Sequence, residues 1–512
     1  MDITSISSFT PPMIIGLMFM SACLSSTSKG WRFAEFLSVT SFLLALCTWI
    51  AIVFFESTPS LTSWLVVTPL RATILLLVSF IAYIVLRYAR TNFQADADNA
   101  RFLPWLTLTI FAVTLTVLSN HMVVFWFAWV LISLSMHKLL VFYPSRYRAV
   151  LAAHKKFISA RVAELCLATA FLLLYQVHQS FFIGEILQQY PVANMAWQQQ
   201  LAAVLFAVVA LVKCAQLPLH GWLIQVVESP TPVSALLHAG VINLGGFLLV
   251  LFAPLFSLVA AAQWLVLVVA GFTAAFAALV MMTRISIKVR LAWSTTAQMG
   301  LMLVECGLGL YELALLHLAA HSCYKAHAFL SAGSTVSDAI QNQFVGKFKP
   351  SLGAWLVSAV ISLLIVATLY ATLAAKPPFT PWVLIAIALS VSLAFRVSQP
   401  VSFSFLKGFA DAIILAVLYV LLKFGAAYLL PPVGHVYLWQ ADVFISALFV
   451  GVLAIYLFLE YQPTNATSRK LFVALNAGFY LDEWSTRLAL RVWPIQLPKN
   501  GVNNLMTSQT KR

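Results

Sequence analysis

The stretch at residues 213–246, KCAQLPLHGWLIQVVESPTPVSALLHAGVINLGG, decides the fold, because it puts ionisable side chains into a chain that is otherwise almost continuously apolar. An ionisable group at bilayer depth costs at least about 2.5 to 3.5 kcal/mol on insertion scales. In membrane proteins such groups usually mark an ion or proton path. Ion translocation is therefore the first functional hypothesis for this chain.

The composition around this stretch excludes a water-soluble globule, because 62% of the 512 residues are hydrophobic and only 9% are charged. Apolar runs of about 18 to 25 residues, long enough to cross a bilayer, recur along most of the chain. No strand-like alternation interrupts them, which favours a helical bundle over a barrel. We expect an all-α polytopic membrane protein with about 14 to 15 transmembrane helices. The apolar runs begin near residues 11, 33, 64, 103, 121, 157, 201, 231, 258, 289, 313, 353, 379, 405 and 439.

The net charge of +14 indicates topology and not nucleic-acid binding, because the basic residues gather in short connections between apolar runs. The residues assigned to these connections are Lys29, Arg32, Arg87, Arg90, Arg101, Arg146, Arg148, Lys155, Lys156, Arg284, Lys288, Arg290, Lys347 and Lys349. By the positive-inside rule they face the cytoplasm. This predicts a multi-pass protein of the bacterial cytoplasmic (inner) membrane, with its N-terminus outside and its C-terminus in the cytoplasm.

Two sequence regions are expected. Residues 1–460 form the transmembrane bundle, with the chemistry-bearing motifs at 155–335, and residues 461–512 form a cytoplasmic interfacial tail. Trp484 and Trp493, with Arg487 and Arg491, suit an amphipathic segment at the lipid headgroups. A docking surface for a neighbouring subunit is the alternative interpretation of this tail.

The cysteines and the missing nucleotide motifs point away from catalysis. The six cysteines have no CxxC spacing and lie within or beside apolar runs, which predicts core residues. They are Cys23, Cys47, Cys166, Cys214, Cys306 and Cys323. Because no nucleotide-binding or nucleophile motif accompanies them, we expect no catalytic residue, metal or cofactor in this chain.

A broken helix is expected beside Lys213. Pro218 follows the lysine by five residues, removes a helix hydrogen bond and obstructs the preceding turn. Such a break can place a buried charge beside a small hydrated cavity. The preferred acid partner of Lys213 is Glu164, although Glu164 also has a local alternative role in neutralising Arg161. The alternative for Lys213 is a side chain that snorkels to the interface.

Three titratable residues further along the chain form what we call the ladder. His317, His321 and Lys325 recur at i, i+4 and i+8, so they rise along one helix face at about 6 Å per step. Histidine, with a reference pKa of about 6.5, can accept and donate a proton at small cost. We interpret the ladder as a proton relay to which His238 is a further link. A metal site and ordinary core histidines are the alternatives.

Several further residues are candidates for the same path. Glu228 is expected to cap or position the broken helix, and Lys288 is either part of the path or an ordinary topogenic cation. The remaining candidates are Glu305 in the path, Lys407 and Lys423 in an exit route, and Pro230 and Pro232 as helix-breaking residues.

Four strings in order, KCAQLPLHGWL, ESPTPVSALLHAG, IKVRLAWSTTAQMGLM and LHLAAHSCYKAHAFLSAGS, resemble the antiporter-like subunits of respiratory complex I and the Mrp cation/proton antiporters. The resemblance covers residues 155–335 and implies about 14 to 16 helices, two of them broken, around a central polar axis. It matches Lys213 to the family's central lysine, His238 to the next histidine and Lys288 to the lysine of the following motif. It also matches the ladder to the connecting His/His/Lys residues, and Glu164 to the acid of an R-V-x-[DE] string, here RVAE.

Departures from that family pattern narrow the choice. The usual Trp-Glu-Leu string reads Trp129, Val130, Leu131, so the glutamate that normally partners the central lysine is absent. An FFSKDE-like string is not recognisable, although Lys376 stands at a comparable distance. The chain also lacks the long lateral helix of the complex I subunit. The strings HAGVINLGGFLL and YKAHAFLSAGS look most like the membrane subunits of the DAB inorganic-carbon accumulating complexes.

That resemblance implies a membrane subunit that conducts H⁺ or Na⁺ and energises the conversion of CO₂ to bicarbonate. The zinc and the hydration chemistry would belong to a DabA-like partner that resembles a carbonic anhydrase. A subunit of an Mrp-type antiporter or of a complex I-like proton pump is the first alternative. A structural membrane anchor without ion conduction is the second.

Overall fold

The computed structural model describes residues 3–26, 29–55, 64–93, 99–190, 194–333, 349–373, 376–397, 402–434 and 436–494. These residues fold almost entirely into helices, and within them there are only two isolated β-bridges and no sheet. An open strand would leave unpaired backbone groups in lipid, whereas a helix satisfies its own. The prediction of an all-α polytopic membrane protein is confirmed.

The expected spans correspond to fifteen helices or helix runs in the described part of the chain. They are α1 (Ile3–Leu24), α2 (Gly30–Phe55), α3 (Pro69–Asn92), α4 (Asn99–Leu118), α5 (Met122–Leu140), α6 (Tyr147–His178), α8 (Trp197–Lys213), α10 with α11 (Thr231–Ala239, Leu244–Leu251), α13 (Ala260–Met282), α14 (Ile287–Gly307), α15 (Tyr311–Leu330), α17 (Leu352–Thr372), α18 (Thr380–Val397), α19 (Ser402–Tyr428) and α20 (Trp439–Tyr461). Shorter elements are α7 (Ile183–Gln188), α9 (Gly221–Gln225), η1 (Val226–Glu228), η2 (Val241–Asn243), α12 (Ala253–Phe256), α21 (Ala466–Asn476), η3 (Gly478–Tyr480) and α22 (Glu483–Val492).

Length and apolar composition alone identify 11 membrane-spanning candidates among the described residues. Helices α1 and α8 contribute shorter apolar stretches. Helices α14 and α15 are long enough to span but more polar, since α14 carries Lys288 and Glu305 and α15 carries the predicted ladder. These two more polar spans carry the ladder, Lys288 and Glu305.

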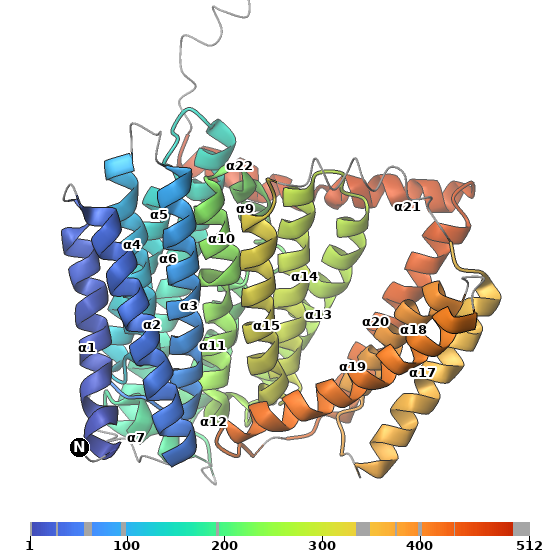
Figure 1. The fold of residues 1–512 in the computed structure, drawn as a ribbon, viewed down its shortest axis with the longest axis horizontal. Helices are drawn as coiled ribbons and strands as arrows, with labels where there is room; N and C mark the ends of the chain where they lie inside the picture. Colours follow the sequence, from blue (N-terminus) through green and yellow to red (C-terminus); the bar gives the residue numbers. More distant parts are fainter. Residues whose placement is uncertain are drawn as a thin grey trace, which may run out of the picture.

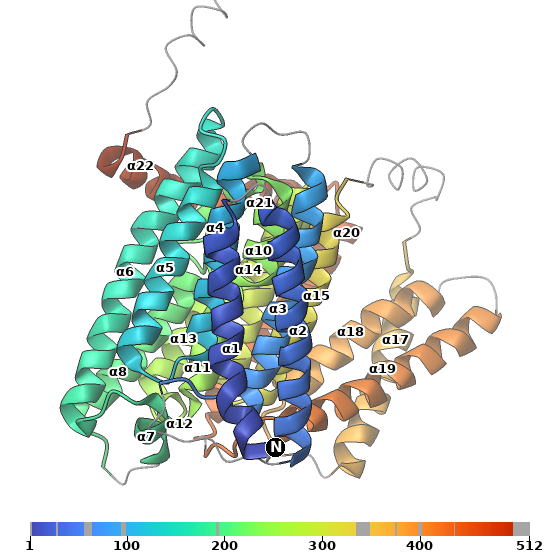
Figure 2. The same ribbon diagram turned by 60° about the vertical axis from the view of Figure 1, so that its left-hand side comes forward.

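Most of the helices stand side by side in one bundle, whereas α17, α18 and α19 form a tilted group beside it (Figure 1). The bundle has one continuous apolar core that runs through α1–α15 and reaches α20. A separate small core joins α17, α18 and α19. Helices α21 and α22 lie along one edge of the bundle, across the ends of the spans (Figures 1 and 2).

The tilted group is fastened to α20 by a buried acid. The Asp442 carboxylate accepts hydrogen bonds from the backbone amides of Phe379 and Thr380, at 2.6 and 2.8 Å. These amides lie at the start of α18, where an anion is favoured by the helix dipole. On the other side α19 contacts α15, and the two helices are linked by Lys423 and Glu312 at 3.8 Å.

The break after α8 lies at Lys213, which is the last residue of the helix. The chain then passes through Ala215, whose φ is +51°, and reaches α9 at Gly221. Helix α11 packs closely against this turn. A Cβ atom at Gly245 would lie 2.6 Å from the Cys214 sulfur and 2.8 Å from the Ala210 carbonyl oxygen, so only glycine fits there.

A second discontinuity separates α10 from α11. Pro230 and Pro232 do not cause this break. They lie at the junction of η1 and α10, with Pro232 in the first turn of α10, where proline is tolerated. The backbone leaves the α-helix further on, at Gly240, and continues as η2. The segment is therefore broken in the middle of its apolar run.

The assignment of Lys155 and Lys156 to a loop is wrong. Both lie well inside α6, which begins at Tyr147, and they are 4% and 5% exposed. Helix α6 has 32 residues, more than the roughly 20 that a bilayer requires. The positive-inside pattern cannot distinguish a loop cation from one carried inward by such an extension.

The core prediction for the cysteines holds only in part. Cys214 and Cys306 are buried, Cys166 is partly buried, and the other three are exposed.

Candidate ion path

The residues at the α8 break form what we call the Lys213 cluster: Lys213, Lys156, Glu164 and Arg161. Lys213, Lys156 and Glu164 line one cavity of about 30 Å³ between α5, α6, α8 and α10. A cavity of this volume is large enough for a water molecule. The Lys213 ammonium nitrogen lies 4.5 Å from the centroid of the Trp129 ring, a cation–π distance.

Glu164 lies in this cavity but its direct partner is Arg161. The Arg161 Nη2 atom donates to the Glu164 carboxylate at 2.7 Å and to the Ser133 hydroxyl at 3.0 Å. In the described part of the chain no ion pair within 4.0 Å joins Glu164 to Lys213. The hydrogen bonding of Glu164 thus matches its alternative role of neutralising Arg161. The shared cavity nevertheless keeps its carboxylate electrostatically close to Lys213.

Helix α5 has Val130 where the family resemblance led us to expect an acid, and it contacts the Lys213 cluster through Ser133 instead. Ser133 lies about one turn beyond Val130, and its carbonyl oxygen accepts a 3.0 Å hydrogen bond from the Lys156 ammonium. The sequence analysis missed Lys156 as a site residue. A usable signal was present, since Lys156 and Glu164 are separated by eight residues, as are His317 and Lys325.

The ladder residues lie together on α15, facing α10 and α14. Lys325 is fully buried and donates to the backbone oxygen of Leu291 at 3.0 Å. His321 is 5% exposed, and neither of its ring nitrogens has a hydrogen-bond partner among the described residues. The rings of His317 and His321 are 6.3 Å apart. The described residues therefore offer few hydrogen-bond acceptors to a proton carried by His321 or Lys325.

His238 on α10 joins the ladder through α14. Its Nδ1 atom lies 3.1 Å from the Thr295 hydroxyl, which itself donates to the Leu291 oxygen at 3.0 Å. Because the hydroxyl proton is used in that bond, Nδ1 is the donor to Thr295 and Nε2 is left as a free acceptor. The Leu291 oxygen also accepts a hydrogen bond from Lys325, so Thr295 and this carbonyl group link His238 to Lys325.

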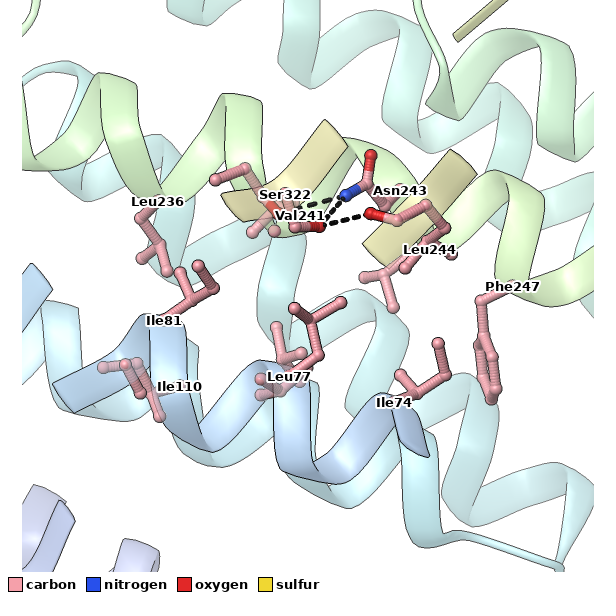
Figure 3. A pocket seen from close by; sticks show the side chains of 16 residues that line it. Ile74, Leu77, Ile81, Ile110, Leu236, Val241, Asn243, Leu244, Phe247 and Ser322 are labelled. Carbon is pink, nitrogen blue, oxygen red and sulfur yellow. Dashed lines mark hydrogen bonds between the residues drawn. The ribbon is translucent and has the colours of Figure 1, made fainter. Parts of the chain in front are cut away.

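The α10–α11 break is fixed next to this ladder by Asn243 (Figure 3). Its side-chain amide donates to the Ser322 hydroxyl at 2.7 Å and to the Ala239 oxygen at 3.0 Å. The surrounding cavity, about 30 Å³, is lined mainly by apolar side chains such as Ile74, Leu77 and Phe247. Asn243 thus ties the irregular backbone to the helix that carries His321.

The remaining candidate path residues lie toward two different ends of the helical bundle. His317 pairs with Glu305 at 3.1 Å, on the side of the bundle where Glu312 meets Lys423. Lys288 donates to the Thr231 hydroxyl at 3.2 Å and lines an open cavity of about 610 Å³.

Glu228, at the rim of the same large cavity, has a 45% exposed side chain and lies 3.7 Å from Arg148. The structure thus puts Glu228 at the surface. Lys376 and Lys407 are exposed.

The tail docks beside the α8 break through Asp482, which the sequence analysis did not single out. The Asp482 carboxylate binds the Lys155 ammonium at 2.7 Å and the Gln225 side-chain amide at 3.1 Å. Trp493 stacks on the His154 ring at 4.0 Å. These contacts join residues more than 250 positions apart, and no local sequence pattern predicts them.

Comparison with known proteins places this arrangement in a family. The model of the NADH:quinone oxidoreductase/Mrp antiporter transmembrane family matches residues 119–410. A probable inorganic carbon transporter subunit DabB of Hydrogenovibrio crunogenus is 47% identical over 485 residues, covering 94% of each chain. The probable subunit DabB2 of Halothiobacillus neapolitanus is 36% identical over 82% of this chain and 78% of its own.

Solved structures agree at the level of the fold. A chain in the Mrp complex from Dietzia sp. DQ12-45-1b has a TM-score of 0.64 and 20% identity, covering 95% of this chain and 59% of that chain. A chain of an archaeal membrane-bound sulfane sulfur reductase has a TM-score of 0.56 and 16% identity, covering 93% of this chain and 99% of that chain.

Proposed function

The chain belongs to the NADH:quinone oxidoreductase/Mrp antiporter transmembrane family, among its DabB-type inorganic carbon transporter subunits, and on this premise we propose that it conducts H⁺ or Na⁺ across the membrane. Ion flow down its gradient energises a complex that converts CO₂ to bicarbonate and accumulates it. The Lys213 cluster carries the proposal, because a lysine at a broken helix shares a water-sized cavity with Glu164 and Lys156.

The path we propose follows the broken segments. The open cavity at Lys288 gives access from one aqueous side, and the Lys213 cluster holds the transported charge inside the bundle. Leu237, which lines the cluster cavity, is followed directly by His238, so α10 leads from the cluster to the ladder. Glu305 and Lys423 continue the path toward α19.

The ladder favours H⁺ as the ion. Imidazole and ammonium groups accept and release protons, whereas Na⁺ requires oxygen ligands. His238, His321 and Lys325 present nitrogen atoms, and the Leu291 carbonyl oxygen already accepts hydrogen bonds from Thr295 and Lys325.

We assign the carbon chemistry to a partner subunit. The curated relatives are named as transporter subunits, which supports a multi-subunit complex. The zinc and the hydroxide nucleophile reside, in this proposal, in a DabA-like partner that resembles a carbonic anhydrase. The chain lies in the bacterial cytoplasmic membrane with its C-terminal tail in the cytoplasm, the topology that the distribution of basic residues favours.

The experiment that tests this assignment is gentle purification of the complex from native membranes, followed by mass spectrometry and zinc analysis. A large zinc-bearing partner in fixed ratio is the expected result. Recovery of small antiporter subunits, or of subunits with flavin and iron–sulfur clusters, would assign the chain to cation exchange or respiration and contradict the proposal.

Two activity measurements separate the other functions. An antiporter subunit would dissipate a pH gradient in vesicles in response to added cation and without CO₂. A structural anchor would keep full carbon uptake in the Lys213→Ala variant. The fold similarity to the Mrp complex makes the antiport assay the necessary control.

A further inference from the structure

Lys156 is a buried cation of the Lys213 cluster to which the proposed path assigns no role. Its ammonium group is inside the bundle, its side chain is only 5% exposed, and it lines the same small cavity as Lys213 and Glu164. A lysine in such a place is costly unless it is paired or can lose its proton.

The cluster does not supply enough negative charge for its cations. Glu164 is the one carboxylate among the described residues of the cavity, and its hydrogen bond goes to Arg161 at 2.7 Å. Lys156 and Lys213 then face each other across the cavity without a carboxylate of their own. Two like charges in a low-dielectric site titrate as a pair, because the first proton to bind opposes the second.

The hydrogen bond of Lys156 is compatible with either protonation state. Its acceptor is the neutral carbonyl oxygen of Ser133, at 3.0 Å, to which an ammonium or a neutral amine can donate. The adjacent Lys155 is different, since its ammonium forms a 2.7 Å ion pair with Asp482. Neighbouring lysines on α6 therefore have distinct environments, one anchored by an acid and one not.

The titratable groups that face Lys156 are few. On α6 itself they are Arg161 and Glu164, on α5 His137, and on α8 Lys213. Trp222 of α9 closes the cavity without adding a charge.

We propose that Lys156 is a second proton-carrying amine, which exchanges a proton with Lys213 through the cavity while Glu164 stays ionised beside Arg161. In one state Lys213 is an ammonium and Lys156 a neutral amine. Transfer of one proton, directly or through a water molecule, makes Lys213 neutral and Lys156 an ammonium. The total charge of the cluster is unchanged. The inference rests on the proposed ion conduction and gives the site an amine pair where the family resemblance implies a lysine and a glutamate.

Substitution of Lys156 by arginine tests the inference. Arginine keeps the positive charge and the donor to Ser133 but does not deprotonate in proteins. In the intact complex we expect Lys156→Arg to lower ion-driven bicarbonate uptake at least about tenfold, with normal assembly. Lys155→Arg is the matched control, because it keeps the ion pair with Asp482 and should stay within about twofold of wild type. Wild-type uptake in Lys156→Arg would show a fixed charge and overturn the proposal.

A histidine and a methionine variant keep the test decisive if arginine does not fit. Lys156→His restores a titratable group of lower pKa, so partial uptake with its pH profile displaced to lower pH is expected. An active histidine variant with the wild-type pH profile would contradict the role. Lys156→Met should assemble, because a group that is neutral during part of its cycle must be tolerated in neutral form, and failure of assembly would also count against the proposal.

The failure of this inference can be distinguished from the failure of the proposed function. If wild-type uptake does not depend on an ion gradient, or if Lys213→Ala is fully active, ion conduction itself is refuted. If both of those tests succeed while Lys156→Arg is fully active, only the role of Lys156 is refuted.

Discussion

The Lys213 cluster and the α15 ladder lie at successive positions of the proposed path and handle charge in opposite ways. In the cluster an acid, an arginine and two lysines gather around one small cavity. On the ladder Lys325 donates to a backbone oxygen, and the described residues offer His321 no hydrogen-bond partner. In the first region a single carboxylate, Glu164, compensates part of the positive charge, whereas in the second His321 can stay neutral at low cost and needs no carboxylate.

This difference suggests a division of labour. The partly compensated cluster can hold one charge at equilibrium, because Glu164 and the Trp129 ring stabilise it. On the ladder, His321 has no carboxylate or other hydrogen-bond partner among the described residues, so it is most stable when neutral and carries a proton only transiently. Substitutions in the two regions should therefore have similar effects on transport and different effects on stability.

Removal of the central amine should have the largest effect. Lys213→Ala eliminates the charge that the α8 break presents to the cavity, so carbon uptake should fall at least about 100-fold. The variant should still assemble, since the ammonium group has no hydrogen-bond partner among the described residues and loses only its cation–π contact with Trp129. Uptake of labelled bicarbonate and the yield of purified complex measure the two effects. Loss of assembly together with uptake would indicate a structural role.

Neutralisation of the cluster acid should reduce both transport and stability. Glu164→Gln leaves the Arg161 guanidinium without its carboxylate and removes the negative charge from the cavity. We expect uptake to fall about tenfold and the thermal unfolding midpoint of the complex to decrease. Glu483→Gln is the control, because its exposed carboxylate pairs with Arg487 of the same helix at 3.1 Å and lies outside the proposed path. An equal loss in both variants would remove the distinction between a path residue and a surface acid.

A ladder substitution should separate transport from stability. His321→Leu deletes a buried polar ring whose nitrogens have no partner among the described residues, so the protein should be as stable as wild type or more so. Uptake should nevertheless fall about tenfold, because the relay is interrupted. His327→Leu, an exposed position on the same helix, should keep uptake within about twofold. A marked drop in the unfolding midpoint of His321→Leu would show that the histidine is a structural core residue.

The docking of the tail should matter least for conduction. Asp482→Asn weakens the ion pair with Lys155 but retains hydrogen-bonding groups toward Gln225. We expect a change in uptake of less than about threefold and faster proteolysis of residues 462–494 in membranes. If uptake were abolished, the tail would belong to the path itself and the contrast between the cluster and the ladder would be incomplete.

Sequence patterns predict the spans well and the cluster only in part. Apolar run length identifies 11 of the fifteen spans in the described part of the chain, because the bilayer imposes that length. The i, i+4, i+8 spacing places His317, His321 and Lys325 on one face. The partner of Glu164 was harder to predict, because Arg161 on the same helix and Lys213 on another helix compete for its carboxylate. Lys156 was assigned to topology because loop cations and buried cations have the same sequence appearance. The Asp482–Lys155 pair depends on tertiary packing alone.

Reconstitution of the intact complex into vesicles tests the central claim most directly. A proton gradient is imposed, and bicarbonate accumulation is measured for wild type, for wild type with an uncoupler, and for Lys213→Ala. The account predicts accumulation in wild type alone, with Lys213→Ala behaving like the uncoupled protein. Accumulation that survives the uncoupler, or that proceeds unchanged in Lys213→Ala, would contradict it.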